Sequence, residues 1–90
     1  MNTDELRERL DALFPQLVDE LSQLVAIPSV SSDPSHAADV DRSAEHIRSR
    51  FEALGLDAQI HSVTTPEGVQ GKPAILARSP HIEGAPTVLL

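Results

Sequence analysis

The segment that decides how this chain is organised reads Leu24-Val25-Ala26-Ile27-Pro28-Ser29-Val30-Ser31-Ser32. Pro28 lacks an amide hydrogen and disfavours helical backbone at Ile27, so a helix entering this segment must end near Ala26. One helical pattern lies before the segment. After it come a loop, a second helical pattern and three strand-like runs, so these nine residues separate the two halves of the chain.

The first helical pattern covers about residues 3–26. Its apolar residues recur at steps of three and four, as on the buried stripe of an amphipathic helix; they are Leu6, Leu10, Leu13, Phe14, Leu17, Val18, Leu21, Leu24 and Val25. Asn2, with Glu5 three residues on, predicts an N-terminal cap. Pro15 predicts either a kink near Leu13-Phe14 or two helices, with Pro15 in the first turn of the second. Ordering so long a helix costs about as much as its stripe can contribute, so it must dock.

The second helical pattern covers about residues 36–54 and follows a polar loop at 29–35. Its apolar residues form one narrow stripe, made of Val40, Ala44, Ile47, Phe51 and Leu54. Asp33 or Ser35 is expected to cap its start. Gly55 stands where a left-handed residue closes a helix, with Leu56 placed to fold back on Phe51. The pattern therefore predicts a helix that passes directly into a strand.

Three runs read as strands, at about 56–63, 74–79 and 87–90, with a turn-rich connection at 64–73. The first alternates apolar and polar residues, whereas 87–90 is wholly apolar, as in a sheet covered on both faces. The fold class predicted is α/β, with two N-terminal helices followed by the first strands of a mixed sheet. Because a covered strand needs further elements, we expect the 90 residues to be the beginning of a larger protein or a truncated reading frame.

Composition excludes several classes of function. The formal charge of −7, with one lysine and six scattered arginines, argues against a nucleic-acid partner. No cysteine is present, so disulfides and thiolate metal sites are impossible. Neither a signal peptide nor an apolar run of membrane-spanning length is visible, so we expect a cytoplasmic protein without a membrane partner. Twelve of the fourteen acidic residues precede residue 58, which indicates helices with a solvated face.

Two sets of side chains suggest chemistry. Ser29, Ser31, Ser32, Asp33 and His36 could supply a nucleophile and its base, but no Gly-x-Ser-x-Gly turn surrounds any of these serines, and helix capping explains them more simply. The residue types that ligate metals are His36, Asp39, Asp41, Glu45 and His46. They lack a His-Glu-x-x-His spacing. His61 on a strand and His81 in a loop have no second ligand beside them, so all are interpreted as surface residues.

Four segments of the chain carry a family resemblance. They are the helix ending in Leu24-Val25-Ala26-Ile27-Pro28-Ser29-Val30-Ser31, the Leu54-Gly55-Leu56 closure, Gly71-Lys72-Pro73-Ala74-Ile75-Leu76-Ala77 and the closing Pro86-Thr87-Val88-Leu89-Leu90. Over its whole length the chain resembles the N-terminus of the zinc metallopeptidases that include carnosine-type dipeptidases, acetylornithine deacetylase and succinyl-diaminopimelate desuccinylase. The sequence from Lys72 to Leu90 is most similar to the dipeptidase branch of that family.

The resemblance implies that residues 1–90 are the N-terminal part of a zinc-exopeptidase-like catalytic α/β domain, whose remainder is absent, in a homodimeric enzyme. Two zinc ions would activate a water that cleaves the amide bond of a dipeptide or N-acyl amino acid. The first ligands of that family lie in a Gly-His-x-Asp pattern that would follow Leu90. No catalytic, cofactor-binding or metal-binding residue is therefore assigned between Met1 and Leu90, and we expect the chain alone to be an inactive scaffold. The alternative is a small acidic interaction module that docks through its first amphipathic helix.

Overall fold

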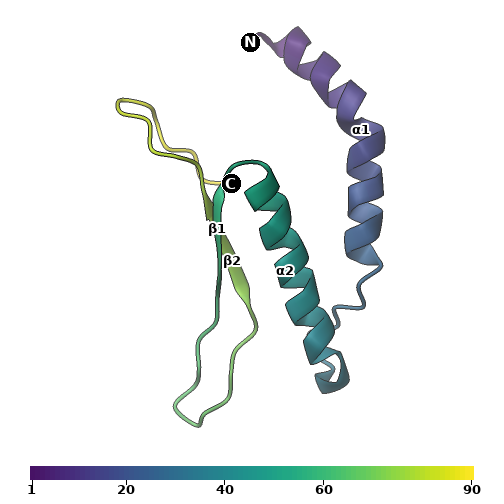
Figure 1. Cartoon of the computed structure of the whole chain (residues 1–90), viewed down its shortest axis with the longest axis vertical. Coiled ribbons are helices and arrows are strands. Elements are labelled where there is room, and N and C mark those ends of the chain that lie inside the picture. The colour runs from purple at the N-terminus through teal and green to yellow at the C-terminus, as the bar shows by residue number, and fades with distance from the viewer. The chain divides into compact units, whose positions relative to one another are not determined.

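The computed structural model describes all 90 residues (Figure 1). In chain order it contains α1 (Thr3–Val25), the short 3-10 helix η1 (Pro34–His36), α2 (Ala37–Ala53), β1 (Asp57–His61) and β2 (Ala74–Arg78). The chain divides into two compact units, residues 1–43 and 44–90. Two helices followed by an antiparallel strand pair confirm the expected combination of helices and sheet in its coarse form.

Helix α1 begins with the expected capping box. The Glu5 amide donates to Asn2 Oδ1 at 2.9 Å, and the Asn2 amide donates to Glu5 Oε2 at 3.1 Å, so both free amides are satisfied by side chains. Pro15 lies inside one uninterrupted helix, which changes direction about midway along its length (Figure 1). Of the two alternatives for Pro15, the single bent helix is therefore the one observed. Neither helix of the chain is both long and apolar enough to cross a membrane.

Helix α1 ends where Pro28 requires it to end. The Ala26 amide still donates to Ser22 O at 3.0 Å, but the Ile27 amide reaches back only three residues, to Leu24 O at 3.2 Å. Short turns then follow, with the Ser29 amide donating to Ile27 O at 2.7 Å and the Val30 amide to Pro28 O at 2.9 Å. Pro28 cannot donate, so the helical ladder stops and the chain is turned toward η1.

Helix α2 closes at Gly55 as the sequence predicts. Gly55 has a φ of 83°, its amide donates to Glu52 O at 2.9 Å, and the Leu56 amide donates to Phe51 O at 3.1 Å. This pair of bonds is the Schellman arrangement, which needs a left-handed residue that glycine adopts at least cost. Glu52 adds a link to the strand, since its Oε1 accepts from the Ala58 amide at 3.1 Å. Backbone hydrogen bonds at Gly55 and Leu56 and the side-chain bond from Glu52 together fix the connection between α2 and β1.

Strands β1 and β2 form an antiparallel hairpin, with Asp57 opposite Arg78, Ala58 opposite Ala77 and Ile60 opposite Ile75. Ala58 is buried and Ile75 and Ala77 are half-buried, so one face of the hairpin is apolar. Beyond the strands an isolated bridge pairs Thr64 with Gln70. The long connection therefore remains a paired ribbon as far as a tight turn containing Gly68, whose φ is 86°.

The strands are shorter than the sequence predicts, and one predicted strand is absent. Strands predicted at 56–63 and 74–79 are limited to Asp57–His61 and Ala74–Arg78. The prediction of a strand at 87–90 is wrong for this structure, because β1 and β2 pair only with each other and residues 87–90 join no ladder. The one pair observed is antiparallel, and the mixed sheet of which it would be the first part stays a prediction. An apolar run becomes a strand only when a partner strand supplies its hydrogen bonds.

The chain buries very little of its own apolar surface. The only buried residues are Ala44 at 4% exposure and Ala58 at 6%, and no large side chain is fully buried. Many large apolar side chains are exposed, including most of the α1 stripe and all of Val88, Leu89 and Leu90. Monomeric proteins rarely leave contiguous apolar surface of this extent open to water. Each of the two units is therefore built from well-capped local elements and buries little apolar surface of its own.

Gly71 provides a test of the hairpin connection. Its amide donates to Val63 O at 2.7 Å, and a Cβ added there would lie 2.8 Å from that same backbone oxygen. We predict that Gly71→Ala breaks this bond and the neighbouring Thr64–Gln70 bridge. Gly68→Asn is the control, because nothing lies within 4 Å of a Cβ at Gly68 and asparagine tolerates positive φ. NOEs between Thr64 and Gln70 measure the bridge; their survival at full strength in Gly71→Ala would contradict this account.

Candidate functional site

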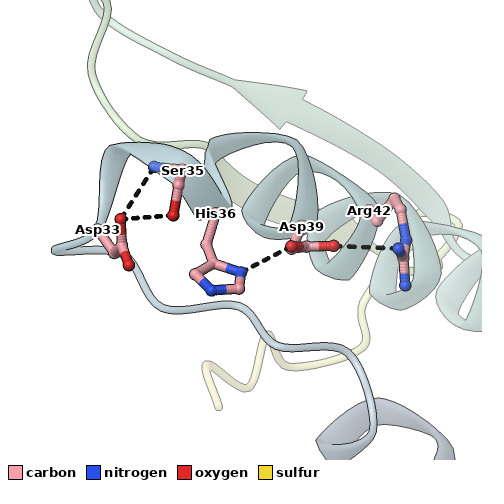
Figure 2. Close-up of polar contacts among 5 residues, drawn as sticks. All are labelled: Asp33, Ser35, His36, Asp39 and Arg42. Carbon is pink, nitrogen blue, oxygen red and sulfur yellow. Dashed lines mark hydrogen bonds and ion pairs between the residues drawn. The ribbon is translucent and has the colours of Figure 1, made fainter.

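A group of polar side chains lies where η1 leads into α2, and it includes several residues that the sequence singled out (Figure 2). It consists of Asp33, Ser35, His36, Asp39 and Arg42. Asp33 precedes η1, Ser35 and His36 lie within it, and the other two occupy the first turns of α2. Spacings of two and three residues place these side chains on adjoining turns, so local structure alone brings them together.

Asp33 is the cap of this segment. Its Oδ1 accepts from the Ser35 amide at 2.9 Å and from the Ser35 hydroxyl at 2.7 Å. The hydroxyl bond and then the amide bond hold the pKa of the Asp33 carboxyl below its ordinary value. Of the two capping residues that the sequence left open, Asp33 accepts from the backbone, and Ser35 supplies its amide and its hydroxyl to it.

His36, Asp39 and Arg42 form a second chain of contacts along the same side of α2. His36 Nδ1 lies 2.8 Å from Asp39 Oδ2, and Arg42 Nη1 donates to Asp39 Oδ1 at 3.0 Å. Both carboxylate oxygens of Asp39 are thus engaged, and its side chain is only 20% exposed. An acidic residue in the first turn also suits the positive end of the helix dipole. The contacts fasten the first turns of α2 to η1.

The contacts in this cluster do not form a nucleophilic relay. A Ser-His-Asp relay needs the serine hydroxyl to donate to the histidine ring while the carboxylate holds the other ring nitrogen. Here the Ser35 hydroxyl donates to Asp33, and Figure 2 shows the His36 ring turned toward Asp39. Ser29, Ser31 and Ser32 are exposed, and none has a hydrogen bond to His36. The geometry favours capping over catalysis, in agreement with the sequence interpretation.

The residues present do not fit a two-zinc centre. Arg42 occupies one oxygen of Asp39 and brings a positive charge, which disfavours a cation at that carboxylate. No group of three or more His, Asp or Glu side chains converges in a metal-binding arrangement. Asp41, Glu45 and His46 lie further along α2, where Glu45 is bound to Arg48. No step of a zinc mechanism can be derived from these side chains.

The two remaining histidines lie in the second unit. His61 ends β1 opposite Ala74 and lines a shallow groove of about 300 Å³ on the polar face of the hairpin. The groove is otherwise lined by Asp57, Gln59, Leu76 and Arg78. His81 Nε2 lies 3.3 Å from Glu83 Oε2, and both side chains project into solvent. His61 therefore lies on a strand and His81 in a loop, which are the elements that the sequence predicts for them.

One polar network was not anticipated from the sequence. Arg48 is bound to Glu45 and approaches Glu52, with Nη1 3.8 Å from Oε1, and Glu52 accepts from the Ala58 amide. The Arg48 hydrogen bond lowers the pKa of Glu45, and the same bond raises the pKa of Arg48. The spacings 45–48 and 48–52 were visible signals of helical ion pairs. Nothing local indicated that Glu52 would reach the backbone of β1.

No protein-family model, curated protein or solved structure matches this chain.

The Asp33 cap predicts a pH dependence at the start of η1. The folded pKa of Asp33 lies below the unfolded value of about 3.9, so the ionised carboxyl stabilises the folded form above that pH. This contribution is lost as the pH falls through the lower, folded pKa. We predict that the Ser35 amide resonance moves with the Asp33 titration below the ordinary range. In Ser35→Ala, which keeps the amide but loses the hydroxyl, the Asp33 pKa should rise; an unchanged pKa would show that the hydroxyl bond is not formed.

Proposed function

We propose that this chain is the N-terminal scaffold of a zinc-dependent, dipeptidase-like metallopeptidase. The observation that carries the proposal is the position of Ile27-Pro28-Ser29-Val30-Ser31 directly after the 23-residue helix α1, as the family resemblance requires. The order of two helices and an antiparallel strand pair, with Gly55 closing α2, supports it. The proposed parent is a cytoplasmic homodimer of zinc-exopeptidase fold that hydrolyses dipeptides or N-acyl amino acids with two zinc ions.

Within such an enzyme this chain would provide surfaces for packing and would hold no reacting group. The exposed apolar residues of α1, together with Val88, Leu89 and Leu90, are the surfaces that further parts of a catalytic domain would cover. The carboxylates of Asp33, Asp39 and Glu45 are engaged in a cap and in ion pairs. In this proposal the zinc ligands and the general base belong to residues outside positions 1–90, and the segment positions the sheet that presents them.

The direct test of this proposal is to sequence the transcript that encodes the chain beyond codon 90. The expected result is an open frame that continues the apolar run 87–90 into Gly-His-x-Asp. A stop codon immediately after codon 90, in a transcript whose 90-residue product accumulates, would contradict the scaffold role. The readout is independent of any activity of the short chain, so a lack of hydrolysis by the 90 residues does not affect the result.

Zinc titration tests the assignment of no ligand to this chain. We predict that calorimetry of the 90-residue chain with zinc chloride gives no site of micromolar or tighter affinity, because Asp39 is engaged by His36 and Arg42. Arg42→Gln is the matched variant, since it removes the competing cation and leaves both metal-ligand types in place. Micromolar binding by the unmodified chain that disappears in His36→Ala would overturn the assignment.

A second candidate function is a small acidic interaction module that docks through α1. A specific observation favours it: eight large apolar side chains of one helix are 44–72% exposed. They are Leu6, Leu10, Leu13, Phe14, Leu17, Val18, Leu21 and Val25. A 23-residue helix gains most of its stability from packing such a face, so an uncovered stripe indicates a surface that a partner covers.

Substitution within the stripe measures whether it is covered inside the chain. We predict that Leu17→Ala, studied in dilute solution, changes the free energy of unfolding by less than about 0.5 kcal/mol beyond helix propensity, because Leu17 is 44% exposed. Ala44→Leu is the contrasting variant, since Ala44 is buried and added volume there costs about 1–3 kcal/mol. Urea denaturation measures both. A loss of about 2–5 kcal/mol in Leu17→Ala, as for a core leucine, would rule out the docking role.

A further inference from the structure

The apolar stripe of α1 has an internal repeat that bears on what covers it. Four positions recur eleven residues later: Leu6 and Leu17, Leu10 and Leu21, Leu13 and Leu24, Phe14 and Val25. Eleven residues make three turns at 3.67 residues per turn, close to the 3.6 of a straight helix. The stripe therefore runs almost parallel to the helix axis along the whole of α1. The stripe follows α1 through the bend at its middle, and a second copy of α1 presents a stripe of the same length and the same course.

We propose that α1 is covered by α1 of a second copy of this chain, packed antiparallel. The proposal rests on the second candidate function and names its partner. With the two-fold axis near the middle of the helix, Leu10 of one copy lies between Leu17 and Leu21 of the other. Leu13 lies between Phe14 and Leu17 of the other copy. These are knobs entering holes between residues one turn apart, which is how paired helices interlock.

The charges beside the stripe favour this orientation. Arg9 and Glu20 are also eleven residues apart, so they lie on the same flank of α1 near opposite ends. In an antiparallel pair equal flanks meet, which brings Arg9 of each copy to Glu20 of the other. A parallel pair would not bring these two together. Glu20 accepts a hydrogen bond from Gln16 at 3.0 Å, and a carboxylate has acceptor capacity for several donors.

The available area is sufficient for a weak specific dimer. Eight apolar side chains about half exposed offer on the order of 600 Å² per helix, so two copies would bury on the order of 1,200 Å². Stable interfaces begin at about 1,200 Å². An anionic membrane surface is a poorer occupant, because α1 carries six acidic residues and only two arginines.

Sedimentation equilibrium of the 90-residue chain, from about 1 to 500 μM, tests the proposal. The expected mass rises from 9.7 kDa toward twice that value. Glu20→Arg, which places arginines opposite each other at both ends, should weaken the dimer about tenfold or more. Combining it with Arg9→Glu should restore the affinity. Asp19→Arg is the matched control, because it changes the net charge equally from the polar side of α1 and should leave the affinity within about twofold.

Cross-linking tests the orientation, and the absence of native cysteine makes the result unambiguous. Under mild oxidation by oxidised glutathione, a mixture of Leu6→Cys and Leu24→Cys chains should form a mixed disulfide, while neither variant cross-links with itself. Self-cross-linking of each variant would establish a parallel pair and overturn the proposal. A mass of 9.7 kDa at every concentration would also overturn it. So would a failure of Arg9→Glu to restore the dimer affinity that Glu20→Arg lowers. If the chain is monomeric and Leu17→Ala leaves the free energy of unfolding unchanged, self-pairing alone is refuted. If the chain is monomeric and Leu17→Ala lowers that free energy as for a core leucine, the docking role is refuted as well.

Discussion

The rest of this structure depends on one constraint: the chain carries much more apolar surface than its own residues bury. Helix α1 presents a continuous stripe of leucine, valine and phenylalanine, while the only buried residues of the chain are Ala44 and Ala58. Burial of apolar area is the main favourable contribution to folding, and it must offset the entropy lost when the backbone is ordered. A chain that leaves this area open gains stability mainly when something else covers it. Both candidate functions are answers to that one physical problem.

Local hydrogen bonds explain why the elements are nevertheless well defined. The Asn2–Glu5 box begins α1, the Asp33–Ser35 bonds begin η1, and the Gly55 closure ends α2. Each of these devices satisfies backbone groups that a helix end leaves unpaired. They fix where elements start and stop but bury almost nothing. Of the polar side chains that could suggest catalysis, His36 and Asp39 are engaged in the same local task.

What could be predicted from the sequence follows this division between local and distant interactions. The Asn2 cap, the stop at Pro28 and the closure at Gly55 depend on residues within one turn, and the structure contains all three. The strand at 87–90 depended on a partner strand elsewhere, and pattern alone could not show that β1 and β2 would pair only with each other. The bond from the Ala58 amide to Glu52 joins residues six apart across a helix end, so helical spacing gave no sign of it. The proposed zinc enzyme rests on family resemblance and not on these geometries.

The heat-capacity change on unfolding tests most directly whether the two units bury as little apolar surface as each does by itself. Unfolding of a fully packed domain raises its heat capacity by about 12–15 cal/mol/K per residue, or about 1.1–1.4 kcal/mol/K for a chain of this size. Scanning calorimetry on a dilute, monomeric sample should give a broad transition with a heat-capacity change well below this range, because little apolar area is exposed on unfolding. A sharp two-state transition with a value inside that range would contradict the account.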